Sequence, residues 1–147
     1  MGDNEIWVID NEHDDHEILE EIADSLKIEH KLRFFDDPKK FLSCLGEVSS
    51  APFIIICCVH LAGPDGFKVR ERLLKEPNKK FHSVPFIYLS NHASESQINK
   101  AYRDYAHGFF VKPDSIQEWR SILRLVLSYW SRCKMPSKHD TFDAPLA

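Results

Sequence analysis

The 147-residue sequence lacks an excess of basic residues, any long apolar run and the start of a signal peptide. With 19 basic and 23 acidic residues its formal net charge is -4, which gives no basic field for gathering phosphates, so we expect no nucleic-acid partner. No apolar run approaches the roughly 20 residues that span a bilayer. The acidic start, residues 1–5, has neither the basic nor the apolar stretch of a signal peptide. We therefore expect a cytoplasmic protein without a membrane partner.

A metal-binding cysteine pattern is also missing. The four cysteines, Cys44, Cys57, Cys58 and Cys133, show neither a CxxC spacing nor another metal-ligand spacing. Adjacent residues of a strand, such as Cys57 and Cys58, point to opposite faces of a sheet. We expect reduced thiols, as is usual in the cytosol.

The sequence contains no internal repeat and no low-complexity tract. Its length supports one domain with a substantial core and is too short for two ordinary domains. We assign residues 1–132 to this domain. After Arg132 the periodicity stops and prolines follow, so residues 133–147 are expected to form a flexible tail.

Short apolar runs alternate with longer stretches of helical period, a pattern typical of βα units and a parallel sheet. The predicted strands lie near Ile6–Ile9, Lys31–Phe35, Phe53–Cys58, Pro85–Ser90 and Gly108–Val111. The predicted helices cover Asp14–Leu26, Pro38–Leu45, Gly66–Lys75, Glu95–Tyr105 and Ser115–Trp130.

Local residues support several helix boundaries. Asp37 before Pro38, Ser94 before Glu95, and Asp114 or Ser115 are candidate N-caps. In the last helix an apolar stripe is expected to face the sheet or, in part, a partner. It consists of Ile116, Trp119, Leu123, Val126, Leu127 and Trp130.

Polar residues follow the predicted strands at the edge where α/β sheets bind ligands. They are Asp10 and Asn11 after the first strand, Cys58 after the third, Ser90 at the end of the fourth, and Lys112 and Pro113 after the fifth. Acids, a hydroxyl group and a lysine at one edge suit a divalent cation and a phosphoryl group, because hard cations prefer oxygen ligands and lysine neutralises phosphate oxygens.

From Ile6 to about Trp130 the chain resembles the receiver domain of bacterial two-component response regulators, and the stand-alone, CheY-like members in particular. The resemblance rests on Val8–Glu12, the Asp65–Gly66 step, Ser90 and Phe109–Pro113. It implies an α/β fold of flavodoxin-like, doubly wound (βα)5 type. Such a fold is a three-layer sandwich around a parallel five-stranded sheet in the order 2-1-3-4-5.

In that family an aspartate after the third strand accepts a phosphoryl group and acids of the first loop hold magnesium. Carried over by position, Asp10 is such an acid, Ser90 the switch hydroxyl, Lys112 the phosphate-binding lysine and Phe109 the movable aromatic. The sequence departs from this pattern at three positions. Cys58 stands at the phosphoacceptor position, Asn11 replaces the second acid, and Ala62 stands where the loop usually has proline.

A neutral thiol with a pKa of about 8.5 neither ligates magnesium as a carboxylate does nor forms an acyl phosphate. The degenerate phosphorylation site at Cys58 therefore predicts no cofactor and, with Asp10 and Glu12 as the remaining acids, weak or absent magnesium binding. The cluster Asp14–Glu17 is interpreted as a solvated helix start rather than a metal site.

These features predict a non-enzymatic receiver-like protein of a phosphorelay that acts through protein contacts and independently of phosphorylation. Its partners would be a histidine kinase or another signalling protein, or a second copy. The contact surface would be formed by the fourth helix, fifth strand and fifth helix, with Tyr102, Tyr105, Trp119 and Trp130 near the exterior. Two alternatives remain open: phosphorylation at a substitute acid, Asp65 or Asp10, and a thiol-based sensor through Cys58.

Overall fold

The computed structural model describes residues 4–77 and 79–136 of the chain. Five parallel strands form one sheet in the order β2-β1-β3-β4-β5, which confirms the predicted topology. The strands are β1 (Glu5–Ile9), β2 (Lys31–Phe35), β3 (Ile54–Cys57), β4 (Phe86–Ser90) and β5 (Gly108–Val111). Of the expected flexible tail, residues 137–147 lie outside the described residues.

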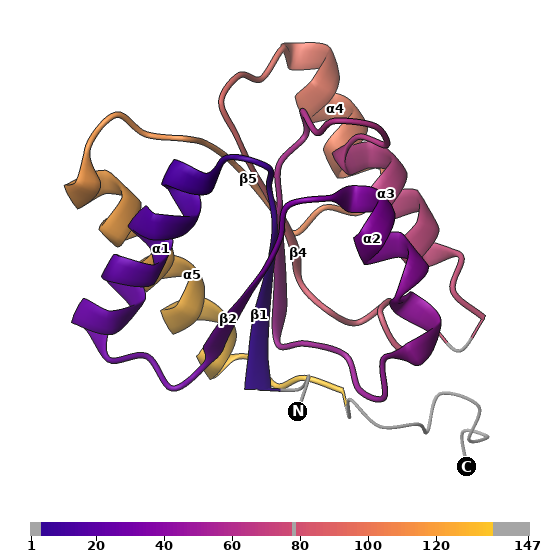
Figure 1. Ribbon diagram of the computed structural model, residues 1–147, viewed down its shortest axis with the longest axis horizontal. Coiled ribbons are helices and arrows are strands. Elements are labelled where there is room, and N and C mark those ends of the chain that lie inside the picture. The colour runs from indigo at the N-terminus through magenta and orange to yellow at the C-terminus, as the bar shows by residue number, and fades with distance from the viewer. Residues whose placement is uncertain (1–3, 78, 137–147) are drawn as a thin grey trace.

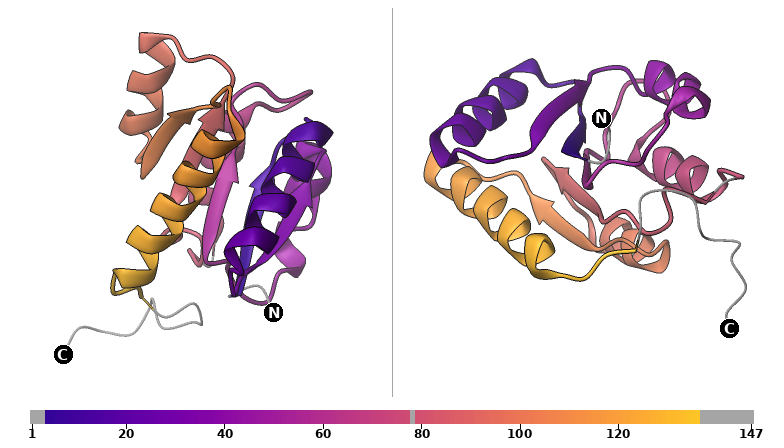
Figure 2. Two further views of the ribbon diagram at one scale, coloured as in Figure 1. Left: turned by 90° about the vertical axis from the view of Figure 1, so that its left-hand side faces the viewer. Right: turned by 90° about the horizontal axis from the view of Figure 1, so that it is seen from below.

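Helices cover both faces of the sheet and give the three layers of the predicted sandwich (Figure 1). The views in Figure 2 place two helices on one face, α1 (His13–Leu26) and α5 (Ile116–Arg132). The other face carries α2 (Pro38–Ser43), α3 (Gly66–Leu74) and α4 (Glu95–Arg103). A short 3-10 helix, η2 (Leu45–Glu47), follows α2. Within the described part of the chain, no helix is both long enough and apolar enough to cross a membrane.

The side chains of β1 alternate between two buried layers. Trp7 and Ile9 belong to the apolar core beneath α2, α3 and α4. Ile6 and Val8 belong to the core beneath α1 and α5. All four are at most 2% exposed. Because both faces of the sheet are buried, its inner strands read as continuous apolar runs in the sequence.

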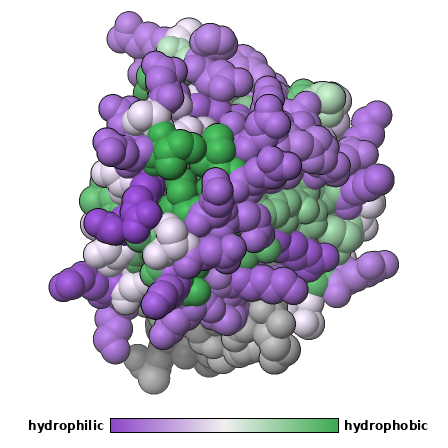
Figure 3. All heavy atoms as spheres, turned by 60° about the vertical axis from the view of Figure 1, so that its left-hand side comes forward, coloured by the Kyte–Doolittle hydropathy of each residue, from purple (hydrophilic) through white to green (hydrophobic). Residues whose placement is uncertain are grey.

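The last helix buries a stripe that begins one turn later than predicted. Its buried members are Trp119, Leu123, Val126 and Leu127, and Trp130 is half-buried. Ile116, in contrast, is 54% exposed, so the expectation that it joins the stripe is wrong. It is the first residue of α5 and precedes the part of the helix that packs on the sheet. On the side of the molecule that carries α1 and α5, a compact group of hydrophobic side chains interrupts a mainly hydrophilic surface (Figure 3).

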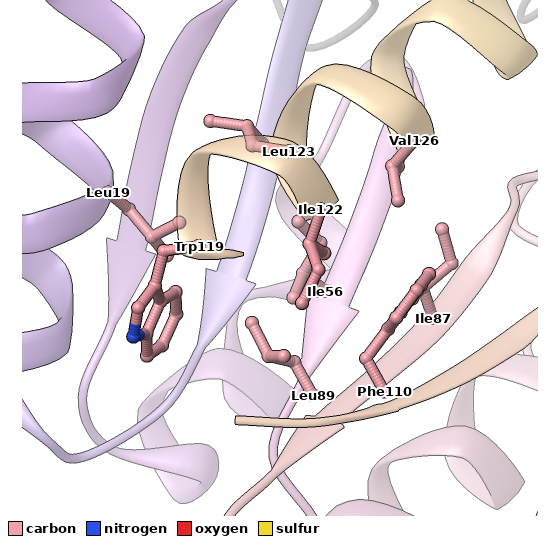
Figure 4. Close-up of a pocket in the computed structure, with 9 residues that line it drawn as sticks. All are labelled: Leu19, Ile56, Ile87, Leu89, Phe110, Trp119, Ile122, Leu123 and Val126. Carbon is pink, nitrogen blue, oxygen red and sulfur yellow. The ribbon is translucent and has the colours of Figure 1, made fainter. Parts of the chain in front are cut away.

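Trp119 belongs to the core between α1, α5 and the sheet. Together with Leu19 it lines a small apolar cavity of about 10 Å³, in which side chains of α5 face those of β3, β4 and β5 (Figure 4). The indole side chain is buried, and burial of an aromatic ring of this size is a large apolar contribution to folding. The expectation that Trp119 lies near the exterior is therefore wrong.

Three helices begin at caps that the sequence predicts. Asp37 caps α2, and Ser94 caps α4 in a reciprocal capping box with Gln97. Of the two candidates before α5, Ser115 and not Asp114 is the cap. These hydrogen bonds join residues two or three positions apart, which is why local sequence reveals them.

Gly66 allows the loop after β3 to fold back onto the end of the strand. Its N–H donates to the carbonyl oxygen of Val59 at 2.9 Å. A Cβ atom at position 66 would lie 2.3 Å from the carbonyl oxygen of Cys58. Because this neighbour is main chain, it cannot rotate away as a side chain could, so only glycine fits here. The close approach fixes where the main chain of Cys58 lies.

We predict that Gly66→Ala lowers the free energy of unfolding by about 1–3 kcal/mol, because the added methyl group collides with the main chain. Gly46→Ala is the matched control, since among the described residues no heavy atom lies within 4 Å of a Cβ atom built there. Urea unfolding followed by circular dichroism measures both variants. An equal loss of stability in the two would contradict the close approach.

His107 joins β4 to β5 through both its main chain and its side chain. The main-chain N–H of His107 donates to the carbonyl oxygen of Phe86 at 2.9 Å, and the N–H of Phe86 donates to His107 Nδ1 at 3.0 Å. A ring nitrogen that accepts this hydrogen bond carries no proton. Burial and the positive charge of Arg70 lower the pKa of His107, which also favours the neutral ring.

A pKa that is lower in the folded state means that protonation favours the unfolded chain. His107 therefore contributes its full stability above its unfolded pKa of about 6.5, and this contribution is lost as the pH falls below that value. We predict that the free energy of unfolding falls more steeply between about pH 7.5 and about pH 5.5 in the parent than in His107→Gln, whose side chain does not titrate. Parallel pH profiles in urea unfolding would refute this role.

Candidate functional site

The carboxyl ends of four strands bring polar side chains together at one edge of the sheet. Asp10 directly follows β1, Cys58 follows β3, Ser90 ends β4 and Lys112 follows β5. The sulfur of Cys58 lies 3.7 Å from Ser90 Oγ, and Lys112 Nζ lies 2.7 Å from Asp10 Oδ2. The predicted convergence is thus present, and Lys112 forms an ion pair with Asp10.

Cys58 is buried, with 3% of its surface exposed. Its sulfur also lies 3.6 Å from the carbonyl oxygen of His60, to which the thiol donates. Burial raises the pKa of the Cys58 thiol and the negative charge of Asp10 raises it further, against a smaller opposing effect of Lys112. The thiol is therefore protonated at neutral pH and is a poor nucleophile.

Lys112 has a second partner that the sequence analysis missed. Its ammonium group lies 2.6 Å from Asp15 Oδ2 in the first turn of α1, in addition to Asp10. The Lys112 side chain is only 4% exposed, and burial by itself would lower its pKa. The hydrogen bonds to Asp10 and Asp15 outweigh burial and raise the pKa of Lys112, so the ammonium group stays charged.

The interpretation of Asp14–Glu17 as a solvated helix start is therefore wrong for two of its four residues. Asp15 binds Lys112, and His16 is 8% exposed. The His16 ring stacks on Phe34 with centroids 4.5 Å apart, and His16 Nε2 lies 2.6 Å from the carbonyl oxygen of Asp10. Because α1 begins only a few residues after β1, the inner side of its first turn lies over the sheet edge. This short connection is the signal that could have revealed the Asp15 contact.

The two other first-loop residues lie at the surface. Asn11 and Glu12 are exposed, and the main-chain N–H of Glu12 donates to Asp10 Oδ1 at 3.0 Å. Asp10 therefore uses one carboxylate oxygen for the loop and the other for Lys112. In residues 4–77 and 79–136, no three His, Cys, Asp or Glu side chains are grouped so that they could hold a metal ion.

Ser90 is fully buried, and its hydroxyl oxygen accepts a hydrogen bond from the N–H of Val59 at 3.4 Å. It thus links the end of β4 to the segment that follows β3. Pro113 is half-buried beside Lys112. Phe109 packs into the core beneath α2, α3 and α4, with its ring 5.4 Å from that of Tyr88. Its role as a movable aromatic stays a prediction.

A buried arginine on α3 binds the C-terminal end of α4. Arg70 is 1% exposed and donates from Nε to the carbonyl oxygen of Asp104 at 3.2 Å and from Nη2 to that of Tyr105 at 2.9 Å. Its guanidinium group also lies 5.0 Å from the ring centroid of Phe86, within cation–π range. Tyr105 has φ +66°, so α4 ends at Arg103 instead of extending to Tyr105 as predicted.

Most of the large exposed apolar side chains belong to α4, β5, α5 or the turn between α4 and β5. Tyr102, Tyr105, Val111, Leu125 and Tyr129 are each at least half exposed. A groove of about 440 Å³ lies beside β5 and α5. Its lining residues are Ile87, His107, Gly108, Phe110, Leu125, Val126, Tyr129 and Trp130.

No model of a protein family matches the chain. A curated relative, the probable methanogenesis regulatory protein FilR2 of Methanothrix harundinacea, is 20% identical over 81 residues. The match covers 55% of this chain and 51% of the relative. The chain thus spans about half the length of that protein.

Several solved structures are similar over nearly the whole chain. The phosphorylated cyanobacterial phytochrome response regulator RcpA has a TM-score of 0.79 at 18% identity, covering 92% of this chain and 99% of its own. A response regulator receiver domain from Rhodospirillum rubrum has a TM-score of 0.77 at 17% identity, with the same coverage.

A third structure is the receiver domain of the sensor histidine kinase PA1611 from Pseudomonas aeruginosa PAO1, with a magnesium ion coordinated in its active-site cleft. It has a TM-score of 0.69 at 17% identity and covers 87% of this chain and 97% of its own. These neighbours, together with five parallel strands in the order β2-β1-β3-β4-β5, identify the fold of the chain as that of CheY-like response regulator receiver domains.

Proposed function

We propose that this chain is a receiver-like signalling module of a phosphorelay that acts through protein contacts and is not phosphorylated at position 58. It binds rather than catalyses, and it works in the cytoplasm, where its free cysteines stay reduced. Its partner is another signalling protein, such as a histidine kinase, or a second copy of the chain. The observation that carries the proposal is Cys58, a buried neutral thiol at the edge where the strand ends converge.

The chemistry of the site supports a silent phosphoacceptor. Attack on a phosphodonor to give an acyl phosphate requires a carboxylate, which Cys58 does not have. The positive charge that would neutralise phosphoryl oxygens is engaged, because Lys112 is bound by Asp10 and Asp15. We propose that magnesium binding is weak or absent for the same reasons. The magnesium-bound Pseudomonas receiver has a similar fold, so the difference we propose lies in the site.

Both candidate substitute acceptors already have hydrogen-bond partners. Asp65 Oδ1 accepts the N–H of Lys68 at 3.0 Å and caps α3. Asp10 uses both carboxylate oxygens, for Glu12 and for Lys112. The raised pKa of Cys58 likewise opposes a thiol sensor, because the thiolate is the form that reacts with oxidants.

We predict that incubation with acetyl phosphate and magnesium leaves the intact mass of the parent protein unchanged. The physical reason is that Cys58 has no carboxylate, that both carboxylate oxygens of Asp10 are engaged, and that Asp65 caps α3. Asp65→Asn and Asp10→Asn serve as controls. A mass increase of one phosphoryl group in the parent that disappears in either variant would identify a substitute acceptor. Loss of Cys58 labelling on oxidation would instead support the thiol sensor.

The partner surface we propose is the face of α4, β5 and α5. Tyr105 lies on it, 73% exposed, in the left-handed conformation that glycine adopts most readily. A residue with a side chain is disfavoured there by roughly 1 kcal/mol or more. The carbonyl oxygen of Tyr105 is held by the buried Arg70, which fixes the strained turn. A strained and exposed tyrosine is best explained by a role of its side chain in a contact.

We predict that Tyr105→Gly stabilises the domain by about 0.5–1 kcal/mol while it weakens self-association, because glycine relieves the turn and removes the aromatic contact. Tyr102→Ala, on the same face, is expected to weaken self-association without unfolding the domain. Thermal melting gives the stability, and sedimentation velocity gives the association.

Lys27→Gly is the matched control for the strain. Lys27 also has a positive φ, 53°, but it lies at the end of α1, away from the proposed face. The Lys27→Gly variant should be more stable than the parent, and its self-association should be unchanged. Unchanged association in both tyrosine variants would place the contact surface elsewhere.

A further inference from the structure

Two carboxylates from different parts of the chain converge on one ammonium group. Asp10 comes from the loop after β1 and Asp15 from the first turn of α1, and their Oδ2 atoms lie 2.7 and 2.6 Å from Lys112 Nζ. The ammonium group has three N–H donors, so the two carboxylates occupy two of them. Lys112 therefore bridges the two acids instead of pairing with one.

The three side chains are largely withdrawn from water. Their exposed fractions are 4% for Lys112, 7% for Asp10 and 18% for Asp15. Two carboxylates close together in a site of low dielectric repel each other, and a cation between them offsets this repulsion. The ammonium group of Lys112 is the cation that makes the arrangement stable.

The side chain at position 58 explains why Asp15 can bind the ammonium group of Lys112. The side chain that follows β3 is a neutral thiol in contact with Ser90 Oγ and the carbonyl oxygen of His60. It offers no carboxylate to Lys112 from the centre of the sheet. The lysine is held instead by the first loop and by α1.

We propose that Lys112 is the resident cation of the Asp10–Asp15 carboxylate pair and thereby keeps divalent cations away from this edge of the sheet. Asp15 is the positioning residue of the arrangement. Carboxylate oxygens are the ligands that Mg²⁺ and Mn²⁺ prefer, so the pair is a latent site for such an ion that the protein fills with its own ammonium group. The inference extends the weak magnesium binding of the proposed function but rests on the ion pairs alone.

The test compares Lys112→Gln with Lys112→Arg, which differ in the charge at position 112. Removal of the positive charge at position 112 leaves Asp10 and Asp15 without a cation between them. Lys112→Gln should therefore bind Mn²⁺ at least about tenfold more tightly than the parent, as measured by calorimetric titration. Lys112→Arg keeps a cation and should bind Mn²⁺ no better than the parent. If Lys112→Gln is unfolded without metal, the proposal requires that MnCl₂ restores its folded circular dichroism spectrum.

Two further variants complete the design. Lys112→Gln/Asp15→Asn should lose the gained affinity, because only one carboxylate remains. Lys100→Gln is the surface control, since Lys100 pairs with Asp104 at 3.1 Å on the exposed side of α4, and it should gain no affinity. The proposal is overturned if Lys112→Gln shows no gain, if the gain persists without Asp15, or if Lys112→Arg gains equally. These outcomes leave the acetyl phosphate and association results unaffected, so the two proposals fail separately.

Discussion

The geometry of the site depends on the ammonium group of Lys112, which joins the end of β5 to the loop after β1 and to α1. Buried ion pairs often add little net stability, yet removal of one partner costs about 3–5 kcal/mol because the other is left charged and unpaired. The interaction therefore selects one arrangement of side chains more than it stabilises the fold. Asp10 shows the effect, since the loop N–H, the ammonium group and the ring of His16 each bind a different one of its oxygen atoms.

Local signals explain what could be predicted from the sequence. The strands were recognisable because both faces of the sheet are buried, and the helix starts because Asp37 and Ser94 bind main-chain groups within their own turn. The convergence of Cys58, Ser90 and Lys112 followed from the rule that parallel strands end at one edge. Asp15 and Arg70 were missed because their partners lie 97 and 34 positions away. In the sequence Asp15 has the pattern of a solvated acid in a first helical turn, and only the short connection between β1 and α1 indicates that this turn lies near the sheet edge.

Similarity of fold does not by itself establish the chemistry of a site. A TM-score of 0.79 to a phosphorylated response regulator coexists with 18% identity, as expected when cores tolerate many apolar replacements that conserve volume and pattern. The same tolerance does not extend to a position such as 58, because a thiol and a carboxylate differ in charge, in pKa and in affinity for hard cations. Such similarity therefore identifies the architecture, whereas the activity has to be argued from the individual side chains.

Arg70 has a mechanical consequence. The C-terminal end of a helix carries a partial negative charge from its unsatisfied carbonyl groups. The guanidinium group of α3 neutralises this end of α4 from beneath, through the carbonyl oxygens of Asp104 and Tyr105. If α4 slid or tilted alone, it would leave a buried cation without acceptors, at a cost comparable to breaking a buried ion pair. Arg70 therefore ties the C-terminal end of α4 to α3, and a displacement of α4 alone is opposed by the loss of these two hydrogen bonds.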